Sequence, residues 1–190
     1  MGLANWLTVL RILLIPVFVT LLVYGQRGPA LLVFLAAALT DWLDGYVARQ
    51  QGSQSRLGAF LDPLADKLLL VSSFVTLTWL RALPFWIAAV VISRDVILMV
   101  GALAIHMAGG RITPRPTRAG KLATFFQVLT VLTGLLAPFY DVPGLDRLVL
   151  WLAAGFTVGS GLQYIVQGMG FLNAVHADEA RERDETSLLR

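Results

Sequence analysis

Four aspartates between residues 41 and 66 are the side chains best placed to do chemistry in this sequence. Asp41 and Asp44 are three residues apart, and Asp62 and Asp66 are four apart. If both segments are helical, each pair lies on one face of its helix, and two facing helices would bring the four carboxylates together. Hard divalent cations prefer oxygen ligands, so the spacing predicts a site for Mg²⁺ or Mn²⁺.

Small residues and one arginine accompany these carboxylates. Gly45 and Ala48 follow Asp41 by one and two helical turns, and Gly58 precedes the second aspartate pair by one turn. Faces without bulky side chains let a flat base or a diphosphate approach the backbone. The planar guanidinium of Arg49 suits phosphate oxygens. Together these residues predict a site for a nucleotide diphosphate.

The composition indicates that these acids belong to an integral membrane protein. Of 190 residues, 57% are hydrophobic and 14% are charged, whereas about 25% of the residues in soluble domains are charged. Without cysteine, the chain has no disulfide and no thiolate metal ligand. The net charge of +3 suits anionic lipid surfaces or phosphate-bearing substrates better than nucleic acid.

Six apolar runs have the length that crosses a bilayer as a helix. They lie at about 7–24, 29–49, 60–80, 84–107, 121–139 and 148–170. We therefore predict an all-α integral membrane fold of six transmembrane helices over residues 1–173, followed by a charged cytoplasmic tail at 174–190. An aspartate at the bilayer centre costs roughly 2.5 to 3.5 kcal/mol. The four acids must therefore lie near an interface, bind a cation, or do both.

Lysine and arginine, which favour cytoplasmic loops, predict the orientation. The loops after the second and fourth runs and the C-terminal tail contain most of them: Arg49, Arg56, Arg111, Arg115, Arg118, Lys121, Arg181, Arg183 and Arg190. The opposite loops contain Arg27, Arg81 and Arg147. We expect both termini to be cytoplasmic, with the carboxylate site opening to that side between the second and third spans.

A second polar set follows the aspartate cluster. Arg94 and Asp95 lie inside the fourth apolar run, where charged residues are costly and therefore candidates for a site. Arg118 and Lys121 lie at the start of the fifth run and can join Arg94 around one phosphate. This predicts an acceptor alcohol that carries a phosphate. The alternatives are a structural ion pair for Asp95 and ordinary cytoplasmic loop charge for Arg118 and Lys121.

The spacing of the aspartate segment resembles the signature of the CDP-alcohol phosphotransferases. It runs Asp-x2-Asp-Gly-x2-Ala-Arg-x8-Gly-x3-Asp-x3-Asp from residue 41 to residue 66. These membrane enzymes move a phosphatidyl or similar group from a CDP-linked donor to an alcohol and release CMP. The opening segment NWLTVLR at residues 5–11 and the six-span layout extend the resemblance over nearly the whole chain.

The resemblance implies roles for individual residues. The four aspartates would bind two divalent ions, Mg²⁺ or Mn²⁺, and Asp66 would also act as the general base on the acceptor hydroxyl. The CDP part of the donor would be held by Asp44, Gly45, Ala48, Arg49 and Gly58. Asn5 and Thr8 would also contact the donor. The resemblance further implies a homodimer whose partners are CDP-diacylglycerol, a glycerol phosphate-type acceptor and membrane lipids.

Two segments resemble particular branches of the family. Ile-Ser-Arg-Asp at 92–95 and the segment at 120–127 are similar to the phosphatidylglycerophosphate synthase and CMP-forming cardiolipin synthase branches. Their acceptors are glycerol 3-phosphate and phosphatidylglycerol, respectively. Asp95 and Pro116–Thr117 favour the cardiolipin synthase branch. The phosphatidylglycerophosphate synthase branch, however, is the commoner enzyme of this size in bacteria. We therefore rank glycerol 3-phosphate first and expect a multi-pass protein of the bacterial cytoplasmic membrane.

Two other interpretations of the four acids compete with a transferase site. One is a buried ion-pair network with Lys67, Arg49 and Arg94, which the complete spacing disfavours. The other is a cation transporter, which predicts acids near the midplane together with internal repeats or broken helices. The sequence shows no such repeat and no matching mid-span Gly/Pro pair.

Overall fold

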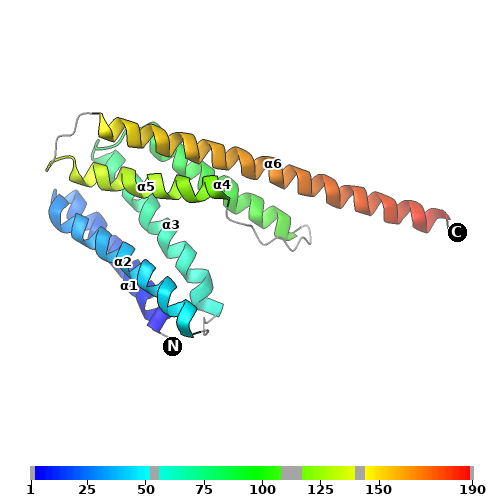
Figure 1. Ribbon diagram of the computed structural model, residues 1–190, viewed down its shortest axis with the longest axis horizontal. Helices are drawn as coiled ribbons and strands as arrows, with labels where there is room; N and C mark the ends of the chain where they lie inside the picture. The colour runs from blue at the N-terminus through cyan, green and yellow to red at the C-terminus, as the bar shows by residue number, and fades with distance from the viewer. Residues whose placement is uncertain (1–2, 52–55, 108–116, 140–143, 189–190) are drawn as a thin grey trace.

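The computed structural model describes residues 3–51, 56–107, 117–139 and 144–188. Inside these ranges, the side chains at 3–5, 41–63, 104–106 and from 170 onward are not described. The described residues form six α-helices (Figure 1). These are α1 (Leu3–Val23), α2 (Arg27–Gln51), α3 (Arg56–Trp79), α4 (Phe85–Met107), α5 (Arg118–Leu136) and α6 (Leu145–Leu188).

The prediction of an all-helical chain is confirmed, and each helix coincides with one predicted span. Within the described residues, four segments are long and apolar enough to cross a membrane: Trp6–Val23, Phe85–Leu103, Arg118–Leu136 and Leu145–Met169. Arg27–Thr40 is a shorter apolar helix. The count of six membrane crossings remains a prediction. Helix α6 continues without a break to Leu188, through the region predicted as a separate tail.

The C-terminal ends of α1 and α3 have the same local backbone geometry. After α1, Gly25 adopts a φ of 74°, and the amides of Gly25 and Gln26 donate to carbonyls of the last helical turn. After α3, Arg81 takes the corresponding position with a φ of 58°. A left-handed residue followed by such backward hydrogen bonds is the usual way to end a helix. Arginine lacks the conformational freedom of glycine, so the second turn is the less favourable one.

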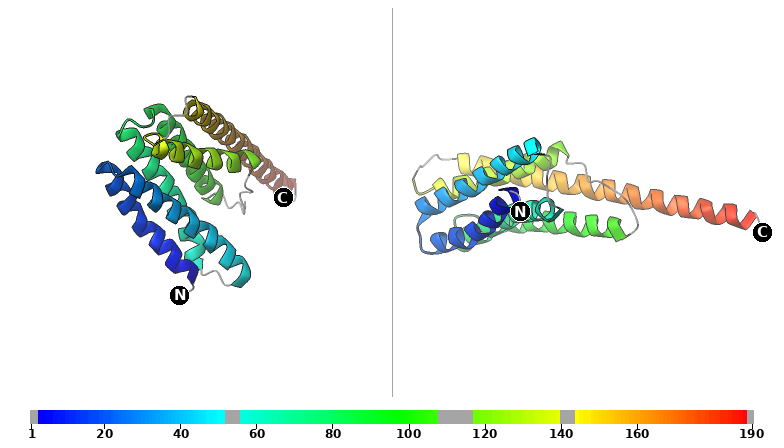
Figure 2. Two further views of the ribbon diagram at one scale, coloured as in Figure 1. Left: turned by 60° about the vertical axis from the view of Figure 1, so that its left-hand side comes forward. Right: turned by 90° about the horizontal axis from the view of Figure 1, so that it is seen from below.

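Helix α3 connects two groups of helices. Helix α1 packs on α2 and α3, while α6 packs on α4 and α5; α3 also contacts α4 and α5. Figure 1 shows α3 running obliquely between the α1–α2 pair and the other three helices. The further views in Figure 2 show the C-terminal part of α6 extending beyond the rest of the bundle. The helix that carries Asp66 therefore contacts elements from both groups.

Aromatic and aliphatic side chains fill the interior, and many others face outward. Phe18 and Phe34 are buried with ring centroids 5.8 Å apart, and Phe74 belongs to the same core. In contrast, Trp79 and Trp151 are 83% and 66% exposed. A bilayer, unlike water, accommodates large apolar side chains on the outside of a helical bundle. The outward apolar surface therefore agrees with the predicted membrane class.

Candidate active site

The predicted aspartate site lies on helices α2 and α3. Positions 41 and 44 belong to α2, and positions 62 and 66 belong to α3, so both segments are helical as predicted. Both helices pack on α1. The side chains of Asp41, Asp44 and Asp62 lie outside the described residues, and so do those of Asn5, Gly45, Ala48, Arg49 and Gly58. The convergence of these groups therefore remains a prediction.

Asp66 is the described member of the cluster, and it receives an arginine from another helix. Arg11 Nη1 of α1 donates to Asp66 Oδ1 at 2.5 Å. The Arg11 side chain is fully buried, whereas the Asp66 side chain is 41% exposed. Thr8, one turn before Arg11 on α1, is also buried. Helix α1 therefore turns a polar, buried face toward the helix that carries the candidate base.

Arg11 is a functional candidate that the sequence interpretation left without a role. It belongs to the NWLTVLR segment, of which Asn5 and Thr8 were assigned to the donor. The sequence feature that could have identified Arg11 is its position inside an apolar run, because ionisable residues within membrane spans usually belong to a site or contact a charged partner. Its partner could not be identified from spacing, since Asp66 lies 55 residues further along the chain.

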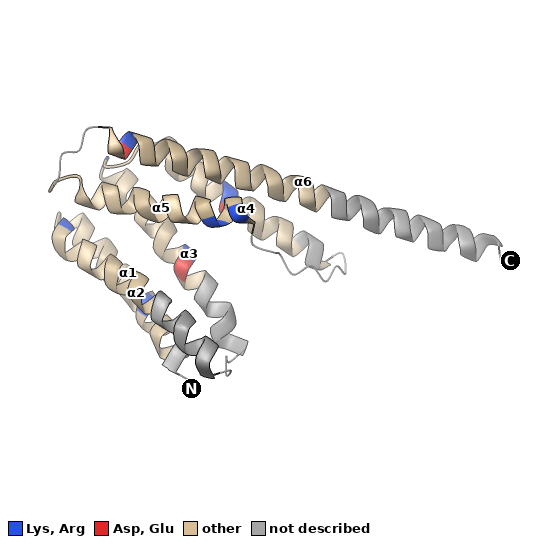
Figure 3. Cartoon of the chain, viewed as in Figure 1, with Lys and Arg blue, Asp and Glu red and all other residues tan. Residues whose placement is uncertain are grey.

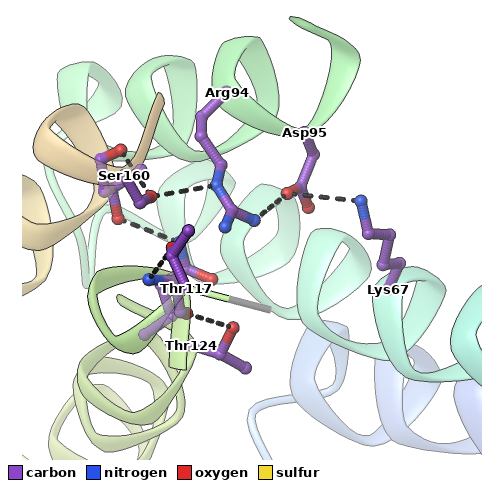
Figure 4. Close-up of polar contacts among 9 residues, drawn as sticks. Lys67, Arg94, Asp95, Thr117, Thr124 and Ser160 are labelled. Atoms are coloured by element: carbon purple, nitrogen blue, oxygen red, sulfur yellow. Dashed lines mark hydrogen bonds and ion pairs between the residues drawn. The ribbon is translucent and has the colours of Figure 1, made fainter. Parts of the chain in front are cut away.

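A second charged cluster links α3 to α4 (Figure 4). Asp95 Oδ1 accepts a hydrogen bond from Arg94 Nη1 at 2.7 Å and lies 3.5 Å from Lys67 Nζ. The side chains of Arg94 and Asp95 are 12% and 15% exposed. The structural ion pair considered for Asp95 is therefore present. Lys67 directly follows Asp66, so this cluster lies beside the predicted site of transfer.

Arg94 extends from α4 to both α5 and α6. Its Nε donates to Ser160 Oγ of α6 at 3.3 Å. On α5, a Cβ atom added at Gly120 would lie 3.5 Å from Arg94 Nη2 and 3.2 Å from Thr117 Oγ1. The absence of a side chain at this position lets the guanidinium lie close to the first turn of α5. Figure 4 shows Arg94 between Ser160, Asp95 and the segment at Thr117.

The start of α5 carries the other two predicted acceptor ligands. Thr117 caps the helix by accepting a hydrogen bond from the Gly120 amide at 3.1 Å, which satisfies one of the free donors at a helix start. Arg118 and Lys121 flank Gly120, and their side chains are exposed. Within the described part of the chain, neither forms an ion pair. Arg94 thus lies next to the helical turn that bears both cations. Figure 3 shows where the basic and acidic positions of the described residues fall along the helices.

Buried hydrogen bonds stabilise the contact between α5 and α6 next to Arg94. Gln127 of α5 donates to Thr157 Oγ1 of α6 at 2.9 Å. Ser160 donates to the Thr157 carbonyl at 3.0 Å while accepting from Arg94. Such a chain holds α5 against α6, because each buried polar group would otherwise lack a partner. The sequence interpretation gave no individual role to Gln127, Thr157 or Ser160.

The donor chemistry of the aspartate set fits a hard divalent cation. All four predicted ligands are carboxylates, and Asp66 is partly exposed beside Arg11 of α1. Among the residues with described side chains, no cluster of three or more His, Cys, Asp or Glu occurs. Three of the four aspartates lie outside that set, so the two-ion site remains a prediction based on ligand type and spacing.

Comparison with known proteins identifies similar sequences over most of the chain. The family described as CDP-alcohol phosphatidyltransferase matches residues 1–159. A Bacillus subtilis protein named CDP-diacylglycerol--glycerol-3-phosphate 3-phosphatidyltransferase is 35% identical over 182 residues, covering 86% of this chain and 93% of that protein. A Pseudomonas fluorescens protein of the same name is 40% identical, covering 87% and 89%.

A third relative has a different name for the same kind of enzyme. It is a Mycobacterium tuberculosis protein named probable phosphatidylglycerophosphate synthase, 35% identical over 88% of this chain and 82% of its own length. These matches confirm the predicted family and enzyme class, and they favour a transferase over the transporter interpretation. The chain belongs to the CDP-alcohol phosphatidyltransferase family.

Proposed function

We propose that this protein transfers a phosphatidyl group from CDP-diacylglycerol to glycerol 3-phosphate and releases CMP. The names of its Bacillus subtilis and Pseudomonas fluorescens relatives support this donor and acceptor. The structural observation that carries the acceptor assignment is the position of Arg94 beside the first turn of α5, which bears Arg118 and Lys121. One cation on α4 and two on the neighbouring turn of α5 suit a phosphate dianion better than a neutral alcohol.

The acceptor phosphate would bind between α4 and α5. Arg94 is held by Asp95 and Ser160, so its guanidinium has a defined direction before any ligand binds. Arg118 and Lys121 are exposed and form no ion pair within the described residues, which leaves them available for phosphate oxygens. The start of a helix adds unpaired amides and a favourable dipole for an anion. Glycerol 3-phosphate carries the phosphate group that such a site would bind.

The CDP part of the donor would be bound by α2, α3 and the start of α1. The small and charged positions of the signature are supplied by Asp44, Gly45, Ala48, Arg49 and Gly58, and Asn5 would contribute from α1. Thr8, which was also predicted to contact the donor, is fully buried and would instead support this face of α1. The helical state of both signature segments supports this assignment, because the spacing then places Gly45 and Ala48 on the same face as Asp41.

Asp41, Asp44, Asp62 and Asp66 would hold two divalent ions, Mg²⁺ or Mn²⁺. When bound, such ions neutralise the diphosphate and the developing charge on the CMP leaving group. Asp66 would accept the proton of the acceptor hydroxyl. That hydroxyl oxygen forms a bond to the phosphorus carrying the diacylglycerol group, and the bond from this phosphorus to the CMP oxygen breaks. The partial exposure of Asp66 supports its access to substrate.

The cellular arrangement follows from the apolar helices and the distribution of charge. We place the protein in the bacterial cytoplasmic membrane as a homodimer with six spans per chain, both termini cytoplasmic and the active site on that side. In support, the last turns of α1, α3 and α5 lie at one end of the bundle in Figure 1. The first turn of α1, the last turn of α2 and the first turn of α3 lie toward the other end.

An acceptor panel tests this function. Purified protein in detergent with CDP-diacylglycerol and Mg²⁺ should release CMP when glycerol 3-phosphate is supplied, and much less when glycerol replaces it. Phosphatidylglycerol should be supplied as a third acceptor, because it is the acceptor of the CMP-forming cardiolipin synthase branch. Faster CMP release with phosphatidylglycerol than with glycerol 3-phosphate would assign the protein to the cardiolipin-forming branch instead.

A further inference from the structure

Arg11 is a charged residue buried within one of the most apolar parts of the chain. It lies inside the segment Trp6–Val23, whose length and composition suit a membrane span, and its side chain is 0% exposed. Ionisable residues in such segments are expensive and are kept near partners of opposite charge. The Arg11 guanidinium donates to the Asp66 carboxylate.

The burial of Arg11 distinguishes its role from direct substrate binding. A fully buried guanidinium has no surface to offer to the donor or the acceptor, whereas the Asp66 side chain keeps 41% of its surface exposed. The arginine therefore contacts the carboxylate from the protein side, and the exposed part of Asp66 remains for a ligand. Among the described residues, Asp66 is the charged partner through which Arg11 can act on the reaction.

Stability alone does not explain an ion pair whose arginine is fully buried at this position. Neighbouring buried residues on α1, including Phe18 and Leu22, pack as ordinary apolar core. Burying a charge costs its hydration, so replacing a buried charged residue and its partner by well-packed apolar residues is often neutral or stabilising; here the guanidinium bears that cost, since only Arg11 is fully buried. The ion pair between Arg11 of α1 and Asp66 of α3 is therefore better explained by a need to hold the Asp66 carboxylate in one orientation.

We propose that Arg11 is a positioning residue that fixes the direction of the Asp66 carboxylate. The inference rests on the proposed role of Asp66 as a base and metal ligand. An aspartate side chain rotates about two bonds, and the planar guanidinium restrains it through a charge-assisted hydrogen bond. Misplacing a reacting group by about 1 Å can reduce a rate about a hundredfold. Arg11 should therefore act mainly on turnover and much less on binding.

The first test separates turnover from binding. Arg11→Met keeps a long apolar stem, Arg11→Lys keeps the charge, and Phe18→Leu is a matched control on the same buried side of α1. We expect Arg11→Met to lower kcat about tenfold to a hundredfold, with CDP binding and both KM values within about twofold of the parent. Arg11→Lys should retain more kcat than Arg11→Met at a similar unfolding temperature.

A double-variant cycle tests whether Arg11 acts through Asp66. Arg11→Met combined with Asp66→Asn should turn over no more slowly than Asp66→Asn alone. Multiplicative losses would overturn the proposal, and so would normal turnover in Arg11→Met. A kcat loss that follows the unfolding temperature equally in Arg11→Met and Phe18→Leu would assign the pair to packing. Loss of CDP binding in Arg11→Met would place Arg11 in the donor site.

A spectroscopic measurement tests the proposal independently of turnover. The electron paramagnetic resonance spectrum of Mn²⁺ added to the purified protein reports the geometry of its ligands. We expect the bound-Mn²⁺ spectrum to change in Arg11→Met, to change less in Arg11→Lys, and to remain that of the parent in Phe18→Leu. An unchanged spectrum in Arg11→Met contradicts positioning. If the parent makes no lipid product but its spectrum responds in this way, the proposed reaction fails while the positioning role stands.

Discussion

Lys67 Nζ lies 3.5 Å from Asp95 Oδ1, the same carboxylate oxygen that accepts a hydrogen bond from Arg94 at 2.7 Å. One aspartate therefore connects the helix carrying Asp66 with the arginine assigned to the acceptor phosphate. Lys67 is 45% exposed, so water screens its half of the link, whereas Arg94 and Asp95 are mostly buried. These contacts would therefore help to hold the proposed phosphate site at a fixed position relative to Asp66, the proposed base.

Replacing Asp95 by asparagine should weaken acceptor binding. The Asp95→Asn side chain keeps its shape but loses the charge that holds Arg94 and Lys67, and charge-assisted hydrogen bonds are about twice as strong as neutral ones. We expect the KM for glycerol 3-phosphate to rise about tenfold, with the KM for CDP-diacylglycerol nearly unchanged. Initial rates measured while each substrate is varied separate the two. A larger effect on the donor KM would place Asp95 in the donor site.

Each acceptor cation should contribute to binding of the phosphate. A hydrogen bond to a charged group is worth about 1.5 to 3 kcal/mol, so Arg94→Ala, Arg118→Ala or Lys121→Ala should raise the acceptor KM about tenfold or more. Arg115→Ala is the matched control, because a cation that only sets topology should change neither KM. If Arg94→Ala and Arg118→Ala weaken CDP-diacylglycerol instead, an uncharged acceptor becomes the better assignment.

Activity should require a divalent cation. Chelation by EDTA should abolish CMP release, and Mg²⁺ or Mn²⁺ should restore it. Asp41→Asn and Asp62→Asn should each remove activity, since these carboxylates are expected to contact both ions. Nucleotide analysis by chromatography provides the readout. Continued CMP release after chelation and in both variants would contradict the metal assignment.

Asp66→Asn should separate donor binding from transfer. The amide cannot accept the hydroxyl proton, whereas the other three aspartates can still hold at least one ion. We expect CDP binding by calorimetry within a few-fold of the parent and a loss of turnover of at least about a hundredfold. Normal turnover would remove Asp66 from the base role. Complete loss of CDP binding would make it a donor ligand like Asp41.

The helices and the family could be predicted because both depend on local patterns. Apolar run length identified all six helices, and the spacing of the signature identified the family. The end of α3 was less readable, since Arg81 adopts the left-handed conformation that usually indicates glycine. The continuation of α6 to Leu188 could not be predicted from run length, because the last part of the helix is polar and lacks the apolar pattern used to define spans.

The contacts around the site could not be predicted, because they join residues far apart in the chain. Arg11 and Asp66 are separated by 55 positions, and Arg94 and Ser160 by 66. Each residue alone has an ordinary explanation as a charge or a small polar group. Packing of α1 on α3 and of α4 on α6 selects the partners. The convergence of the four aspartates on two ions also depends on how two helices pack. It remains a prediction from the spacing of the aspartates.

The most direct measurement is identification of the lipid product. Purified protein would be incubated with CDP-diacylglycerol, Mg²⁺ and glycerol 3-phosphate, and the lipids and nucleotides would be quantified together by mass spectrometry. We predict one phosphatidylglycerophosphate for each CMP released, with both products formed at least about a hundredfold more slowly by Asp66→Asn. CMP release without a phosphate-bearing lipid, or a product formed only when phosphatidylglycerol is supplied, would contradict the proposed reaction.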